Sequence, residues 1–279
     1  MTTHPPAKSN GRPGFLETVR VEELAQRWEW TWRDWLTVLM VPAILCLDFL
    51  PLQKLPGAYT PGYVDVGLRV VFFAVLVALN GPLLARHWRA FRGAFWRSAA
   101  LVIAGLFIIQ FLIQFTRPLL EQIGGGGAGG ADATSAGLDA GPALLAIVGA
   151  EDGGAANPLE APFLGALFLS LGPTVTALIE DFTFRHTLLV KLPVWRNFAI
   201  AAVAVVLNAV LFGAAHINNY DGNILLTLSY AVAGLFMNLV YLWTRNIWHV
   251  LLMHGLNNFI ILGPVTMIFG KLMTQFTGA

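Results

Sequence analysis

Long apolar stretches alternate with short polar connections along most of this chain. A helix needs about 20 mainly apolar residues to cross the hydrocarbon core of a bilayer. About seven stretches approach that length, at residues 35–53, 64–85, 97–116, 160–190, 197–216, 223–244 and 247–270. This pattern predicts an all-α fold, a polytopic transmembrane helical bundle with about seven spans.

The region before the first predicted span has a different pattern. Between residues 19 and 35, apolar side chains recur near helical spacing among charged ones, at Val21, Leu24, Trp28, Trp32 and Trp35. Such a pattern predicts an amphipathic helix lying in the membrane interface, although an ordinary soluble helix would show it too. We therefore expect residues 1–34 to form a cytoplasmic tail followed by this helix.

One long connection divides the predicted spans into two groups. Residues 124–130 are almost all glycine, and the sequence that follows is rich in Ala, Asp, Ser and Thr. A segment of this composition cannot bury enough apolar surface to order itself, so residues 117–159 are predicted to be a flexible loop. The loop would separate three N-terminal transmembrane helices at 35–116 from four spans at 160–270.

Composition and charge support an integral membrane protein. Hydrophobic residues make up 56% of the chain and charged residues 12%, against about 25% charged residues in soluble domains. A net charge of +1 gives no reason to expect nucleic acid as a partner, whereas membrane lipids must surround the spans. The single cysteine, Cys46, excludes an internal disulfide.

Lys and Arg are concentrated in the N-terminal region and in alternate connections, which predicts a cytoplasmic N-terminus. The Ala- and Gly-rich composition suggests a bacterial cytoplasmic membrane.

The first span of the second group carries three charged residues in its interior: Glu180, Asp181 and Arg185. Each charge at membrane depth costs a few kcal/mol, so such groups usually have a function. Asp181 and Arg185 are four residues apart and are predicted to form an ion pair on one helix face. Glu180 projects about 100° away and would be free to act as a general base. A salt-bridge network that only locks helices together is the structural alternative.

Two later spans add further polar groups at a spacing of four residues. Phe212 and His216 share one helix face, and His254 and Asn258 share another. His254 and Asn258 could both donate to one point, as an oxyanion hole requires, or could simply bond neighbouring helices. At about 1.5 Å per residue, Glu180 and Asn258 lie roughly 16–18 Å from the cytoplasmic side but His216 about 28 Å. A deeper start of its span, tilt and bending, or an inverted or re-entrant arrangement could each bring His216 back.

The three motifs, Glu180-Asp181-x-x-x-Arg185, Phe212-x-x-x-His216 and His254-x-x-x-Asn258, occur in an order that resembles one family. They are similar to the motifs of the CAAX-protease and bacteriocin-processing (CPBP, or Abi) intramembrane endopeptidases. The family motif usually begins Glu-Glu, so Asp181 is a departure that shortens the second side chain.

The resemblance implies a catalytic core in the last four spans, within a CPBP-like membrane domain at residues 160–270. It implies that Glu180, helped by His216, activates a water molecule to hydrolyse a peptide bond. His254 and Asn258 would stabilise the oxyanion and Arg185 would hold the acidic motif, with no cofactor. The expected substrate is a membrane-proximal or terminal segment of a peptide or lipid-anchored protein.

Other functions fit some of the same residues. Glu180, His216 and His254 could instead bind Zn²⁺ in a metal-dependent membrane protease, although no His-Glu-x-x-His motif is present. A non-catalytic membrane scaffold that binds peptides would keep the pocket without the reaction. A proton-coupled transporter also uses intramembrane Glu and His, but the chain shows no internal repeat.

Overall fold

The computed structural model describes residues 13–47, 51–124, 157–220 and 222–277. All regular structure within these residues is helical. In chain order the elements are α1 (Phe15–Val19), α2 (Trp32–Leu47), η1 (Pro51–Lys54), α3 (Thr60–Gly93), α4 (Phe95–Ile123), η2 (Pro158–Glu160), α6 (Phe163–Leu169), α7 (Gly172–Asp181), η3 (Phe182–Val190), α8 (Phe198–Ala214), η4 (Ile217–Tyr220), α9 (Leu228–Thr244), α10 (Ile247–Ile261) and α11 (Pro264–Thr277).

The helices coincide with the predicted spans and confirm the polytopic helical bundle. Within the described residues, 4 helical segments are long and apolar enough to cross a membrane: Thr60–Gly93, Phe95–Ile123, Phe163–Val190 and Ile247–Phe276. Shorter apolar helices of 17 residues, α8 and α9, account for two further predicted spans. The 16-residue α2 accounts for the first.

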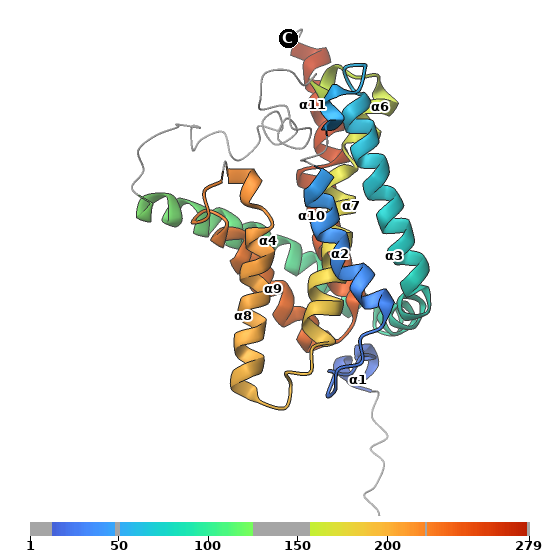
Figure 1. The fold of residues 1–279 in the computed structure, drawn as a ribbon, viewed down its shortest axis with the longest axis vertical. Helices are drawn as coiled ribbons and strands as arrows, with labels where there is room; N and C mark the ends of the chain where they lie inside the picture. Colours follow the sequence, from blue (N-terminus) through green and yellow to red (C-terminus); the bar gives the residue numbers. More distant parts are fainter. Residues whose placement is uncertain (1–12, 48–50, 125–156, 221, 278–279) are drawn as a thin grey trace, which may run out of the picture.

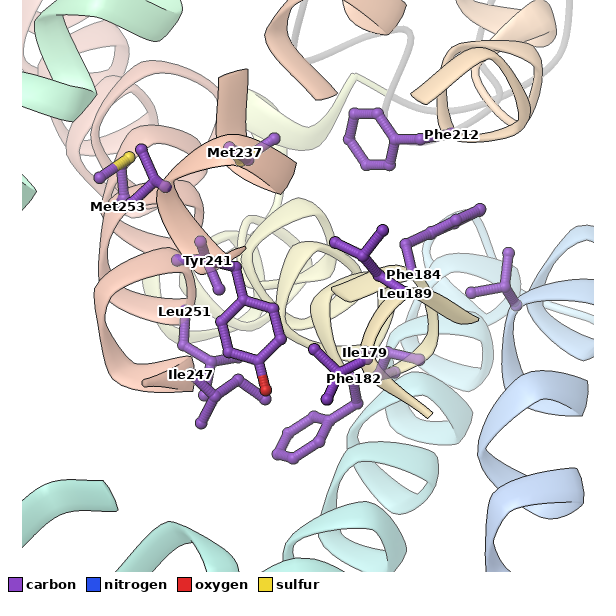
Figure 2. Close-up of a cluster of buried hydrophobic side chains, with 14 of the residues drawn as sticks. Ile179, Phe182, Phe184, Leu189, Phe212, Met237, Tyr241, Ile247, Leu251 and Met253 are labelled. Atoms are coloured by element: carbon purple, nitrogen blue, oxygen red, sulfur yellow. The ribbon is translucent and has the colours of Figure 1, made fainter. Parts of the chain in front are cut away.

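The segment from Phe163 to Val190 forms the centre of the bundle. In its most apolar window 44% of the residues are buried, against 6% to 17% in the other long segments, so it packs on nearly all sides. Figure 1 shows α7 between α10 and α3. Figure 2 shows side chains of this segment, such as Ile179 and Phe182, gathered with Tyr241 and Ile247 from α9 and α10.

The central segment changes its helical geometry immediately after Asp181. The 9 residues of η3 form a π-helix, which is rare and is often found at functional sites. Its wider turns need other partners for some backbone carbonyls. Thr187 Oγ1 donates to the Phe182 carbonyl at 3.0 Å, and Asn208 Nδ2 from α8 donates to the Phe184 carbonyl at 2.9 Å.

Asparagine side chains begin two of the helices in the second half of the chain. The Asn197 Oδ1 atom accepts from the backbone amides of Ala199 and Ile200 and caps α8. Asn246 caps α10 in the same way through Trp248, directly after Arg245 reverses the chain in a left-handed conformation with φ 50°. The two asparagines thus accept hydrogen bonds from the first backbone amides of each helix, which have no acceptor within the helix itself.

The prediction of an amphipathic helix over residues 19–35 is wrong. Helix α1 ends at Val19 and α2 begins at Trp32, and the residues between them have no helix. Their polar groups bond to the bundle instead. The Ala25 amide donates to the Val190 carbonyl at 3.0 Å, and Trp30 Nε1 donates to the Lys191 carbonyl at 3.1 Å. Tertiary partners therefore replace the hydrogen bonds that a helix would have made.

The predicted loop at 117–159 begins later than its composition suggested. Helix α4 continues to Ile123, so the first residues of the predicted loop are helical. The glycine-rich part from 125 to 156 and residues 1–12 of the predicted tail lie outside the described residues.

Candidate active site

Glu180 lies at the C-terminal end of α7 and faces a histidine on either side. Its Oε1 atom is 3.8 Å from His216 Nε2, and its Oε2 atom is 4.0 Å from His254 Nε2. The residue is buried, with 6% of its surface exposed. The structure therefore joins one carboxylate and two imidazoles from three separate stretches of sequence.

His216 contacts Glu180, although the count of 1.5 Å per residue placed His216 much further from the cytoplasmic side than Glu180. Figure 1 shows the connection after η3 continuing away from α7 before the chain turns back into α8. Helix α8 therefore starts lower in the bundle, and its greater length brings His216 to the level of Glu180.

The hydrogen bonding of His216 defines which ring nitrogen faces Glu180. His216 Nδ1 lies 2.8 Å from the Phe212 carbonyl oxygen. A carbonyl only accepts hydrogen bonds, so Nδ1 carries the proton in this contact. In the neutral ring Nε2 is then an acceptor, and this is the atom directed at the Glu180 carboxylate.

His254 contacts both carboxylates of the acidic motif. Its Nδ1 atom is 3.5 Å from Asp181 Oδ1, while its Nε2 atom faces Glu180. His254 thus lies between the two neighbouring carboxylates.

The ion pair predicted between Asp181 and Arg185 is present. Arg185 Nη1 lies 3.2 Å from Asp181 Oδ1, and neither side chain has any exposed surface. The guanidinium carbon also lies 4.0 Å from the centre of the Phe212 ring, a cation–π contact. Asp181 and Arg185 thus neutralise each other inside the bundle and leave Glu180 outside their pair.

Phe212 joins the parts of the site. Its ring centre lies 4.8 Å from that of His216 and 5.7 Å from that of His254, in addition to its contact with Arg185. Figure 2 shows Phe212 next to Phe184 of the central segment. Gly234 on α9 makes room for the ring, since a Cβ atom there would lie 2.6 Å from Phe212 Cδ1. Sequence reasoning missed Gly234, which no motif marks.

Asn258 lies apart from these residues. Its Nδ2 atom donates to the Pro173 carbonyl at 3.1 Å, and its Oδ1 atom accepts from Asn257. Pro173 precedes Glu180 by seven residues, or about 10 Å along a helix. Within the described residues no hydrogen bond or ion pair joins Asn258 to Glu180, His216 or His254.

Asn257 connects this region to the first half of the chain. It accepts a hydrogen bond of 2.6 Å from Gln110 on α4. The Asn257–Asn258 pair therefore holds α10 against α4 and α7 as interhelical hydrogen bonds do.

The described residues contain no group of three or more His, Cys, Asp or Glu arranged to hold a metal ion. Glu180, His216 and His254 approach one another at 3.8 and 4.0 Å between carboxylate oxygen and ring nitrogen. The predicted metal alternative rests on these three residues.

Comparison with known families identifies the second half of the chain. A model of the type II CAAX prenyl endopeptidases, Rce1-like, matches residues 162–260, which include all three motifs. No curated protein and no solved structure matches the chain. Residues 162–260, which build the site around Glu180 within a bundle of apolar helices, thus match an Rce1-like type II CAAX prenyl endopeptidase domain, and this match supports an intramembrane endopeptidase in general.

Proposed function

We propose that Glu180 is the general base of this protease and that His216 assists it. The observation that carries the proposal is the convergence of the Glu180 carboxylate with His216 Nε2 at 3.8 Å inside an apolar bundle. A water molecule between these atoms could hydrogen-bond to both, because the two acceptors lie closer together than two ordinary hydrogen-bond lengths. The carboxylate would take a proton from this water as its oxygen attacks the peptide carbonyl carbon.

The rest of the reaction follows from the same groups. His254 Nε2 would donate to the oxygen that becomes negative in the tetrahedral intermediate. Asn258 would supply a second donor by turning its carboxamide from the Pro173 carbonyl towards His254, which lies one helical turn earlier on α10. When the C–N bond breaks, the proton taken by Glu180 or His216 passes to the leaving amine. The products are a carboxylic acid and an amine, which then ionise to a carboxylate and an ammonium group.

The proposed substrate is a peptide segment at the end of a lipid-anchored or membrane-embedded protein, cleaved at the membrane. Support comes from the match to a family of CAAX prenyl endopeptidases and from the position of the site within apolar helices. A farnesylated peptide ending in a CAAX sequence is therefore the first probe to use.

The decisive experiment compares wild type with Glu180→Gln and His254→Ala, both in membranes and as purified protein. Loss of a general base costs about 10²–10⁴-fold in rate, so Glu180→Gln should abolish measurable cleavage of the probe. Glu160→Gln, an exposed glutamate just before α6, is the matched control and should cleave as wild type does.

Mass spectrometry of peptide termini in the same membranes would identify native substrates. New termini that appear only with wild type and persist with a chelator support the glutamate mechanism. Termini that a chelator removes favour the zinc alternative. If both variants match wild type in every assay, the chain is a peptide-binding scaffold or a transporter and the proposal fails.

A further inference from the structure

Tyr230, the third residue of α9, stacks directly on the imidazole of His216. The two ring centres lie 4.4 Å apart and the ring planes are inclined by only 18°. No other aromatic contact of the site is as close or as nearly parallel. Tyr230 belongs to none of the three sequence motifs.

His216 depends on such a contact because it lies beyond the end of its own helix. Helix α8 ends at Ala214, and within the described residues the hydrogen bond of the His216 ring is the one from Nδ1 to the Phe212 carbonyl. One hydrogen bond leaves an imidazole free to rotate about that bond. A stacked ring removes this freedom, because it fixes the plane of the imidazole as well as one of its atoms.

We propose that Tyr230 is a positioning residue that holds the plane of the His216 ring and so keeps Nε2 directed at Glu180. This inference rests on the proposed function of Glu180 and His216. Rotation of the ring would increase the 3.8 Å separation of the two atoms, and displacements of this kind reduce catalysis strongly. The aromatic face of Tyr230, rather than its hydroxyl group, makes the contact.

Tyr230 is itself supported from the first half of the chain. Its ring centre lies 5.6 Å from that of Tyr220, whose hydroxyl group lies 2.8 Å from Ser229 Oγ. Tyr220 is contacted in turn by Arg117 on α4, whose guanidinium carbon lies 5.6 Å from the Tyr220 ring centre. Through these contacts α4, which the family model does not match, contributes to the geometry of the site.

The kinetic test uses purified protein in detergent and the farnesylated CAAX peptide. Tyr230→Leu removes the aromatic face and should lower kcat about tenfold, equivalent to the loss of one good aromatic contact, with KM changed less than about twofold. Tyr230→Phe keeps the face and should retain wild-type kcat. Tyr63→Leu is the matched control, since Tyr63 packs on Phe168 of α6 in another helix contact, and it should not affect kcat.

Four results would overturn the proposal. Wild-type kcat in Tyr230→Leu would show that the stack does not matter. An equal loss in Tyr230→Phe would assign the effect to the hydroxyl group, and a change in KM alone would make Tyr230 a substrate contact. An equal loss in Tyr63→Leu would show only general destabilisation.

A second measurement does not depend on activity. In protein labelled with ¹³C and ¹⁵N at histidine, the ring resonances of His216 are assigned by their loss in His216→Ala. Tyr230→Leu should shift them, because the ring current of the stacked tyrosine disappears, while Tyr230→Phe should leave them near their wild-type positions. If wild type fails to cleave any peptide, the proposed function fails, and unchanged His216 resonances in Tyr230→Leu would separately overturn the stacking role.

Discussion

The two neighbouring carboxylates of the acidic motif share His254 but differ in their other partners. Asp181 is fully buried and pairs with Arg185 at 3.2 Å, whereas Glu180 faces His216 and His254. An aspartate is long enough to form this ion pair because Arg185 lies four residues later on the same side of the helix. The departure from Glu-Glu is therefore at the position that pairs with arginine, and the longer side chain remains where we propose that water is activated.

The buried ion pair predicts an asymmetric response to mutation. Arg185→Met leaves the Asp181 charge without its partner and should lower the free energy of unfolding by about 3–5 kcal/mol. The double variant Asp181→Leu/Arg185→Met removes both charges and should regain most of that stability. Thermal unfolding in detergent measures both. Equal losses in the single and double variants would show that packing, not charge, is what Arg185 provides.

Close packing between α8 and α9 positions His216, which follows α8, and Tyr230 of α9, which stacks on it. Asn238 Nδ2 on α9 donates to the Val205 carbonyl on α8 at 3.1 Å. At Gly213 a Cβ atom would lie 2.7 Å from the Thr227 carbonyl oxygen and 2.8 Å from Ala231 Cβ. Small residues let helix backbones approach one another in membranes, where lipid tails weaken any hydrophobic drive for helices to associate.

Gly213→Ala should therefore separate the two helices. The contacts are with backbone atoms and with Ala231 Cβ, none of which can turn aside as the end of a flexible side chain can, so we expect a loss of about 1–3 kcal/mol in the free energy of unfolding. Cleavage of the farnesylated peptide should fall as well, because His216 and Tyr230 are on the separated helices. Gly67→Ala on α3 is the control: its Cβ atom would have nothing within 4 Å, so stability and activity should be unchanged.

On the scale of the whole molecule, the segment between α1 and α2 closes one end of the bundle. Arg20 Nε donates to the carbonyl of Trp243, in the last turn of α9, at 2.7 Å. Glu22 contacts Arg86 at 2.8 Å and His87 at 2.9 Å, both on α3. His87 in turn accepts from the Ile247 amide at the start of α10. The segment thereby connects helices from both halves of the chain.

Glu22 makes this closure sensitive to acid. Burial alone would raise the pKa of its carboxyl group, but the hydrogen bond from His87 and the nearby charges of histidine and Arg86 outweigh burial and lower the pKa to about 2 from 4.5. A group whose pKa is lower in the folded state stabilises the fold above its unfolded pKa. Its contribution is therefore complete above pH 4.5 and is lost as the pH falls towards 2.

Thermal unfolding of wild type in detergent should accordingly weaken between pH 6 and pH 3. Glu22→Gln should unfold earlier than wild type at pH 6 and should lose less stability over the same range, because its side chain cannot be protonated. Glu29→Gln changes an exposed carboxylate in the same segment and should follow wild type. Parallel pH curves for wild type and Glu22→Gln would exclude Glu22 as the acid-sensitive contact.

The sequence by itself determined the helical class, the positions of the spans and the Asp181–Arg185 pair. These features depend on local pattern: apolar length selects membrane helices, and a spacing of four residues selects one helix face. The three motifs also predicted the family, because they combine polar groups that lipid would otherwise exclude. No longer-range information was needed for any of these inferences.

Only the tertiary structure decided how the separate motifs meet. The depth of His216 depends on where the connection after η3 turns back, and the position of Asn258 depends on its bond to Pro173. Tyr230 and Gly234 contribute through contacts between helices that no local spacing encodes. Residues 20–31 show the same limit, because a helical pattern gave way to hydrogen bonds with distant parts of the chain. Local pattern specifies helices, whereas side-chain packing between them specifies the site.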